Sequence, residues 1–136
     1  MEAIRDYAVS LGWVVCFLLL AIVARFLFDR ITPFSLRDAS AQKNAAVGRV
    51  LRGLYLGLAI ILAAAMYSTH SILTALRDGA VGIVLMLVMF KAYDLIDRRD
   101  FARELADGNA MLGMELEGLF ILLSAVIVGA MVYAGG

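Results

Sequence analysis

The hydrophobic residues of this chain lie in four long runs, which polar connections separate. The runs cover approximately residues 7–28, 45–67, 72–93 and 110–134. Each contains about 20 residues, the length that an α-helix needs to cross the hydrocarbon core of a bilayer. The pattern predicts an all-α integral membrane protein with four transmembrane helices, in which residues 1–136 form a single transmembrane domain.

A short asparagine and glycine motif occurs twice in the chain, with a separation of 65 residues. Its members are Asn44, Gly48 and Gly53 in the first copy, and Asn109, Gly113 and Gly118 in the second. Each copy of the surrounding sequence holds two apolar runs. We therefore predict two helical-hairpin repeats, at about residues 7–68 and 72–134. They share one orientation, so the repeats are parallel and related by an axis along the membrane normal.

The two longer connections contain local signals for helix ends. Thr32-Pro33 ends the first helix, because proline lacks an amide and restrains the residue before it. Ser35, followed by an acidic residue at Asp38, resembles a capping box, so we expect a helix that begins there and continues into the second span. Residues 94–105 are rich in helix formers and extend the third helix, until Gly108 turns the chain back.

Composition agrees with a membrane protein and indicates its orientation. The chain is 63% hydrophobic, its mean hydropathy is +0.90 and its net charge is zero, which gives no reason to expect nucleic-acid binding. All of its twelve basic residues except Arg5 and Arg77 lie in or beside the first and third connections. Basic residues collect on the cytoplasmic side. We therefore expect both termini to be periplasmic, and no removable signal peptide at the N-terminus.

The duplicated hairpin and its motif resemble a known family. The run Gly108-Asn109-Ala110, and the glycines four and nine residues after each asparagine, are similar to the YjfL-like family, known as domain of unknown function 350. The first copy departs from the motif because Lys43 stands where the second has Gly108. The resemblance implies a small four-span protein of the bacterial inner membrane, and it carries no cofactor or catalytic residue with it.

Charged residues within or beside the spans form the candidate intramembrane polar cluster, because such charges usually face a partner or a water-filled cavity. Its members are Arg25, Asp29, Arg49, Arg52, Asp78, Lys91, Asp94, Glu115 and Glu117. Arg52 and Glu117 occupy equivalent repeat positions, so we expect an ion pair inside the bundle. Its role is to neutralise buried charge or to assist ion or substrate passage; alternatively, both residues lie in the headgroup layer.

Other members of this cluster leave several interpretations open. Spacing places Arg25 with Asp29, and Lys91 with Asp94, on one helix face. Glu115 and Glu117 cannot both face one partner. The aspartate at position 78 is a proton or cation site, a satisfied contact to a neighbouring helix, or a sign that the third helix starts later.

Small residues on the second and fourth spans predict close helix packing. Gly53 and Gly57 form a GxxxG pattern, and Gly118, Ala125 and Gly129 add small positions on the last span. Such faces let helix backbones approach in lipid. The sequence leaves open whether they pack within or between chains, and their number favours a homo-oligomer, in particular a dimer.

The chain offers little material for catalysis or metal binding. It has one histidine, His70, and one cysteine, Cys16, and it lacks nucleotide-binding and catalytic-triad motifs. We expect no enzyme, cofactor or metal site. The leading hypothesis is a non-enzymatic membrane component or scaffold, whose charged cytoplasmic hairpins dock a protein partner or anionic lipid. The alternative is a small oligomeric ion channel or transporter.

Overall fold

Six helices account for nearly all of the described chain. The computed structural model describes residues 1–32, 35–97 and 100–135. Its helices are α1 (Glu2–Ile31), α2 (Leu36–Ala41), α3 (Ala45–Tyr67), α4 (Ile72–Ile96), α5 (Phe101–Ala106) and α6 (Ala110–Gly135). Four of these, α1, α3, α4 and α6, are long and apolar enough to cross a membrane. The predicted all-helical class is confirmed, and so are four helices that are long and apolar enough to cross a membrane.

The helices extend beyond some of the predicted apolar runs. The second run coincides with α3, whereas α1 has 30 residues instead of the 22 between 7 and 28. At 1.5 Å per residue, α1 is about 45 Å long and exceeds a hydrocarbon core of about 30 Å. Polar residues such as Glu2 continue the helix, because backbone hydrogen bonding does not require an apolar side chain.

The first connection contains a separate short helix. Thr32 has an extended backbone (φ −90°, ψ 141°) and ends α1 as predicted, while Pro33 lies outside the described residues. The Ser35 hydroxyl accepts the Asp38 amide at 3.3 Å and caps α2, which confirms this predicted helix start. The prediction that this helix continues into the second span is wrong. Lys43 adopts a left-handed conformation (φ 53°), which interrupts the helical hydrogen-bond pattern.

The second connection is built in the same way. The predicted extension of the third helix over residues 94–105 is wrong, because α4 ends at Ile96 and Asp97 is extended. The Asp100 carboxylate then accepts the Arg103 amide at 3.2 Å and starts α5. Gly108, with φ 83°, makes the predicted turn into α6.

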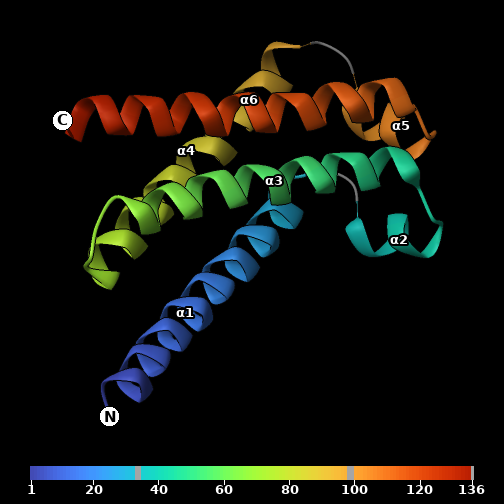
Figure 1. Cartoon of the computed structure of the whole chain (residues 1–136). Helices are drawn as coiled ribbons and strands as arrows, with labels where there is room; N and C mark the ends of the chain where they lie inside the picture. The colour runs from blue at the N-terminus through green and yellow to red at the C-terminus, as the bar shows by residue number, and fades with distance from the viewer. Residues whose placement is uncertain (33–34, 98–99, 136) are drawn as a thin grey trace.

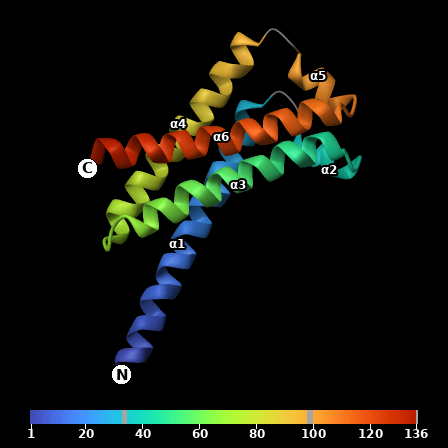
Figure 2. The ribbon, with the colours of Figure 1, turned by 45° about the horizontal axis from the view of Figure 1, so that its top comes forward.

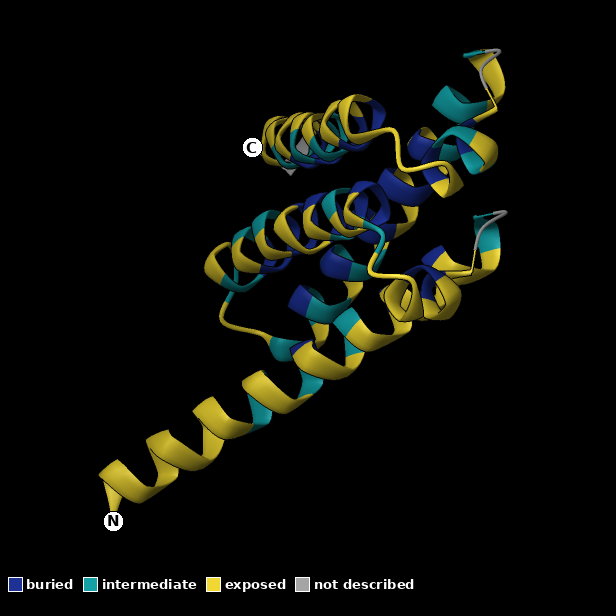
Figure 3. Cartoon of the chain, turned by 90° about the vertical axis from the view of Figure 1, so that its right-hand side faces the viewer, coloured by how far each residue is buried: buried dark blue, intermediate teal, exposed yellow. Residues whose placement is uncertain are grey.

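The arrangement places the short helices at one end of the molecule. In Figures 1 and 2, α3 and α6 lie side by side and run in the same direction. The short helices α2 and α5 lie at the beginning of this pair, whereas both termini and the α3–α4 turn lie toward its other end. The N-terminal part of α1 diverges from the bundle, and its exposed surface is continuous in Figure 3.

Glycines allow the backbones of α3 and α6 to come together. A Cβ atom at Gly53 would lie 2.6 Å from the Glu117 Cα, and one at Gly113 would lie 2.6 Å from the Ala46 carbonyl oxygen. These distances are shorter than van der Waals contact, so only glycine fits at either position without a backbone shift. The small face of α3 is therefore used for packing within the chain.

An aromatic cluster joins three of the long helices at the centre of the core. Phe28 from α1, Phe90 from α4 and Phe120 from α6 are all buried. The rings of Phe90 and Phe120 stack with centroids 4.5 Å apart, and Phe28 meets Phe120 edge to face at 5.6 Å. Such pairs contribute about 0.5–1.5 kcal/mol beyond the area they bury.

Candidate functional site

Arg52 on α3 and Glu117 on α6 form the most complete charged contact. The Arg52 Nε and Nη2 atoms each donate to one carboxylate oxygen of Glu117 at 2.9 Å, in a bidentate arrangement. The side chain of Arg52 is 59% exposed and that of Glu117 is 14% exposed. The predicted pair therefore forms, but its arginine lies on the outside of the bundle, which corrects the expectation of an interior pair.

Helix packing explains the position of this pair. Gly53 lies directly against the Glu117 backbone, so the preceding residue, Arg52, lies beside the contact line and not within it. The long arginine side chain then reaches the carboxylate from the side. Both residues remain close to the polar end of the bundle, about seven residues after the start of each helix.

Lys91 and Asp94 form a second charged contact, with their side chains 3.1 Å apart on α4. The Lys91 ammonium also donates to the Ile31 carbonyl at 3.3 Å, at the last residue of α1. A cation at a helix C-terminus interacts favourably with unpaired carbonyl groups. This contact thus ties the end of α1 to α4.

Asp29 stabilises local structure and does not pair with Arg25. Its carboxylate accepts the amide of Leu36, the first residue of α2, at 3.3 Å. Within the part of the chain that is described, Arg25 forms no ion pair. The shared helix face inferred from the i, i+4 spacing does not bring their charges together.

The remaining members of the predicted cluster lie in separate places. Glu115 accepts a hydrogen bond from the Tyr93 hydroxyl at 3.1 Å, so the two glutamates of α6 have different partners, as their spacing predicts. Arg49 is half-buried on α3. Asp78 pairs with its neighbour Arg77 at 3.0 Å.

The environment of Asp78 excludes two of the interpretations offered for it. Because α4 already starts at Ile72, a later helix start is wrong. The contact with Arg77 is within α4 and not with a neighbouring helix. Seven of the nine predicted residues thus make hydrogen bonds or ion pairs, which lie in several separate small contacts.

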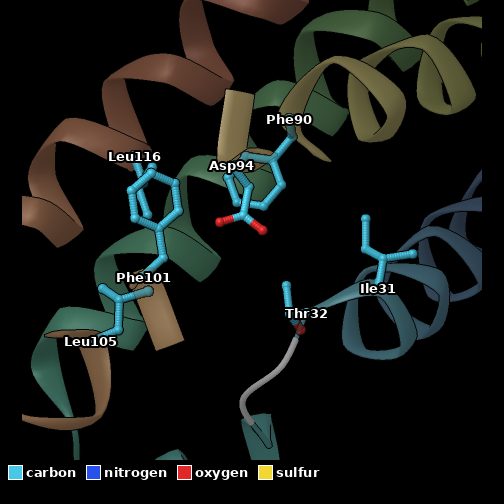
Figure 4. A pocket seen from close by; sticks show the side chains of 7 residues that line it. All are labelled: Ile31, Thr32, Phe90, Asp94, Phe101, Leu105 and Leu116. Atoms are coloured by element: carbon cyan, nitrogen blue, oxygen red, sulfur yellow. The ribbon is translucent and has the colours of Figure 1, made fainter. Parts of the chain in front are cut away.

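A small apolar pocket lies where α1, α4, α5 and α6 meet (Figure 4). It has a volume of about 10 Å³, and its lining consists of Ile31, Thr32, Phe90, Asp94, Phe101, Leu105 and Leu116. Phe101 and Leu105 of α5 are buried against Leu116 of α6. A volume of this size holds at most one water molecule.

A larger pocket lies between α1, α2 and α3, and the sequence patterns did not predict it. Its volume is about 250 Å³, and it is lined by Arg25, Leu36, Ala39, Ser40, Lys43, Asn44, Val47, Gly48 and Leu51. Of these, the sequence had singled out Arg25, Lys43, Asn44 and Gly48, but for other reasons. The one signal in the sequence is that a small residue, Ser40, stands 65 residues before a large one, Leu105, which leaves less volume filled in the first connection.

The glycines divide into two groups. Gly53, Gly57 and Gly113 lie against other helices of the same chain, where an added Cβ would meet atoms at 2.6–2.9 Å. By contrast, a Cβ at Gly48, Gly118 or Gly129 would meet nothing within 4 Å. The GxxxG pattern on α3 is therefore an intrachain packing element, whereas α6 retains small residues on an open face.

The described residues contain no group of three or more histidine, cysteine, aspartate or glutamate side chains that could hold a metal ion. The groups available for binding are the charged side chains at one end of the bundle and the pocket that Arg25 and Lys43 help to line.

Comparison with known proteins identifies the family. The model of the family described as Domain of Unknown Function (DUF350) matches residues 3–132, which is nearly the whole chain. No curated protein and no solved structure matches it. The chain therefore belongs to the DUF350 family, and its four apolar helices indicate a multi-pass membrane protein.

Proposed function

We propose that this DUF350 protein is a non-enzymatic membrane component, whose two charged connections face the cytoplasm and dock a protein partner or anionic lipid. The observation that carries the proposal is the distribution of polar groups. Charged residues surround α2 and α5 at one end of the bundle, whereas the core between the long helices is apolar. A binding surface at this end fits such a distribution better than an ion-conducting path through the protomer does.

The interior of the bundle supports this choice. Ser124 is the single fully buried polar side chain in the described part of the chain, and its hydroxyl donates to the Ile121 carbonyl at 2.8 Å. The rings of Phe28, Phe90 and Phe120 fill the centre. An ion crossing this core would lose its hydration without gaining compensating ligands.

Equal spacing of the structural elements supports two parallel hairpin repeats. The helices α1 and α4 end at Ile31 and Ile96, α2 and α5 begin at Leu36 and Phe101, and α3 and α6 begin at Ala45 and Ala110. Each pair is separated by 65 residues. The turns correspond as well, since Lys43 donates its amide to Ser40 and Gly108 donates its amide to Leu105.

The proposed orientation in a bacterial inner membrane has α2 and α5 in the cytoplasm and both termini in the periplasm. Support comes from the basic residues at the α2 and α5 end, including Arg37 and Arg103. Two further basic residues counted from the sequence, Arg98 and Arg99, lie outside the described residues.

We also propose that the chain forms a homo-oligomer, with a dimer favoured, through α6. Gly118, Ala125 and Gly129 are exposed there and recur on one helix face. The alternative function, an oligomeric channel or transporter, has support from Arg52. Its 59% exposed side chain lies on the outer surface of one protomer and would line a shared axis if that surface met further copies.

Reconstitution in liposomes tests the proposal against this alternative. The purified full chain should give no proton or potassium flux above that of protein-free vesicles. Flux that Glu117→Gln abolishes would establish the channel instead. In cells, a photo-reactive amino acid at exposed Arg37 should cross-link anionic lipid or one cytoplasmic protein, whereas the same group at Ser68, at the other end, should not. Equal cross-linking from both positions would contradict a docking surface at α2.

A further inference from the structure

The two pockets of this protein are related by the same 65-residue spacing as its helices. Four lining positions correspond: Arg25 with Phe90, Leu36 with Phe101, Ser40 with Leu105, and Leu51 with Leu116. In each case, the pocket forms where a short helix meets the end of one long helix and the start of another. Equivalent places in the two hairpins thus hold pockets of about 250 Å³ and about 10 Å³.

Side-chain size explains why one pocket is large and the other almost filled. Phe90, Phe101 and Leu105 are buried and fill the second hairpin's pocket. The corresponding side chains in the first hairpin are smaller, as at Ser40 and Leu36, or are charged and exposed, as at Arg25. In the second hairpin, larger apolar side chains occupy the corresponding space.

The open pocket has the chemistry of an anion site. Arg25 and Lys43 both line it, and neither forms an ion pair with another described residue. Arg25 lies six residues before the end of α1 with apolar neighbours, Ala24 and Phe26, while the acidic residue one turn later, Asp29, accepts the Leu36 amide instead of pairing with it. An arginine in such surroundings is stabilised by a negatively charged partner, and guanidinium binds phosphate oxygens through two parallel hydrogen bonds.

The apolar part of the lining selects among phosphate compounds. The pocket lining combines the two basic side chains with the apolar side chains of Leu36, Val47 and Leu51. The pocket can therefore contact both a charged group and a hydrocarbon group. Gly48 leaves space in the pocket, because nothing lies within 4 Å of the position that a Cβ would take there. A soluble phosphate would leave the apolar lining unused, whereas the glycerol and first methylene groups of a lipid would cover it.

We propose that the pocket between α1, α2 and α3 binds the phosphate headgroup of an anionic phospholipid, with Arg25 and Lys43 contacting the phosphate. The proposal deepens the proposed docking function and rests on it and on the proposed duplication. It assigns the lipid to a defined place in the first hairpin, while the second hairpin's aromatic residues exclude a lipid from the equivalent place.

Native mass spectrometry of the full chain in mild detergent tests this assignment. With dioleoyl phosphatidylglycerol as the probe, the wild-type protein should retain one lipid per protomer, whereas dioleoyl phosphatidylcholine should be lost. Gly48→Leu adds a side chain to the pocket at a position where a Cβ meets nothing within 4 Å, and Arg25→Gln removes a phosphate contact. Each should weaken phosphatidylglycerol binding by about tenfold or more, which is the effect of losing one charge-assisted contact.

Matched variants separate the pocket from general surface effects. Gly12→Leu also enters open space but lies outside the pocket, and Arg5→Gln removes an exposed charge near the N-terminus of α1 that does not line it. Both should bind phosphatidylglycerol as the wild type does. Melting temperatures identify any unfolded variant, and Gly48→Leu decides the question if Arg25→Gln does not fold.

Equal phosphatidylglycerol binding by all four variants would overturn the pocket assignment. Displacement of the lipid by inorganic phosphate at concentrations comparable to those of the lipid would overturn the choice of a phospholipid. In either case, the cross-linking and flux results that test the proposed function are unaffected, because they report on α2 and the bundle as a whole.

Discussion

Arg52 and Glu117 are separated by 65 residues and bind each other across α3 and α6 through two hydrogen bonds of 2.9 Å. In the proposed duplication they occupy corresponding positions, which then carry opposite charges. If the bidentate contact joins the helices, its two residues are energetically coupled. Arg52→Ala and Glu117→Ala should each lower the melting temperature in detergent.

The double variant Arg52→Ala/Glu117→Ala decides whether this coupling exists. It should lose less stability than the sum of the single variants, and Arg52→Glu combined with Glu117→Arg should recover part of the loss. Arg37→Ala, which removes an exposed charge in α2, serves as the control and should add independently to either single variant. Strict additivity of Arg52→Ala and Glu117→Ala would show that the pair contributes nothing to stability.

A second prediction concerns the contact of α3 with α6. Gly53→Ala places a Cβ 2.6 Å from the Glu117 backbone, which cannot rotate away as a side chain can. It should lower the free energy of unfolding by about 1–3 kcal/mol, the usual cost of overpacking. Chemical denaturation in detergent measures the difference.

The matched control for this variant is Gly118→Ala at the equivalent position in α6. A Cβ there meets nothing within 4 Å, so the change should leave stability within about 1 kcal/mol of the wild type, or raise it through helix propensity. Similar losses at Gly53 and Gly118 would mean that the helices pack differently from the structure.

A third prediction concerns the turns before α3 and α6. Lys43 and Gly108 both have positive φ, at 53° and 83°. A left-handed conformation costs an L-residue about 1–2 kcal/mol, which glycine avoids. Lys43→Gly should therefore raise the free energy of unfolding by about 1 kcal/mol, and Gly108→Ala should lower it by a similar amount. Lys43→Ala removes the charge but keeps the strain, so an equal gain in that variant would assign the effect to charge.

A fourth prediction tests the orientation in the membrane. Single cysteines at exposed Ser35 and Asp100, in a Cys16→Ala background, lie at the α2 and α5 end of the molecule. They should resist an impermeant thiol reagent in intact cells and react after lysis. A cysteine at Ser68, beside the α3–α4 turn, should react without lysis. The reverse labelling pattern would place α2 and α5 in the periplasm.

A fifth prediction separates packing within the chain from packing between chains. Gly57 lies against Met86 and the Phe120 carbonyl, so Gly57→Leu should unfold the protein or prevent its accumulation. Gly129 faces open space on α6, so Gly129→Leu should leave the protomer folded but dissociate the proposed homo-oligomer. Mass measurement in detergent and in nanodiscs distinguishes these outcomes. A wild-type chain that is monomeric in both would remove the proposed assembly.

The sequence determined the parts of this structure that depend on local physics. Four long apolar runs predict four spans, because backbone groups in lipid must be satisfied within a helix. Ser35 was identified as a helix cap because its hydroxyl can accept a hydrogen bond from a backbone amide. Gly108 was identified as a turn because glycine has no Cβ and adopts positive φ easily. The family was likewise recognisable from the motif that begins at Asn44 and returns at Asn109.

Tertiary structure decided what happens between helices that are distant in the sequence. The pattern paired Arg52 with Glu117, but the close approach at Gly53 determined that the arginine lies outside the bundle. Lys43 carries no local signal for a left-handed turn, yet the chain adopts one there and interrupts the helix that Ser35 begins. The open pocket beside Arg25 also depends on how three helices meet, because a cavity is the volume that packing leaves unfilled.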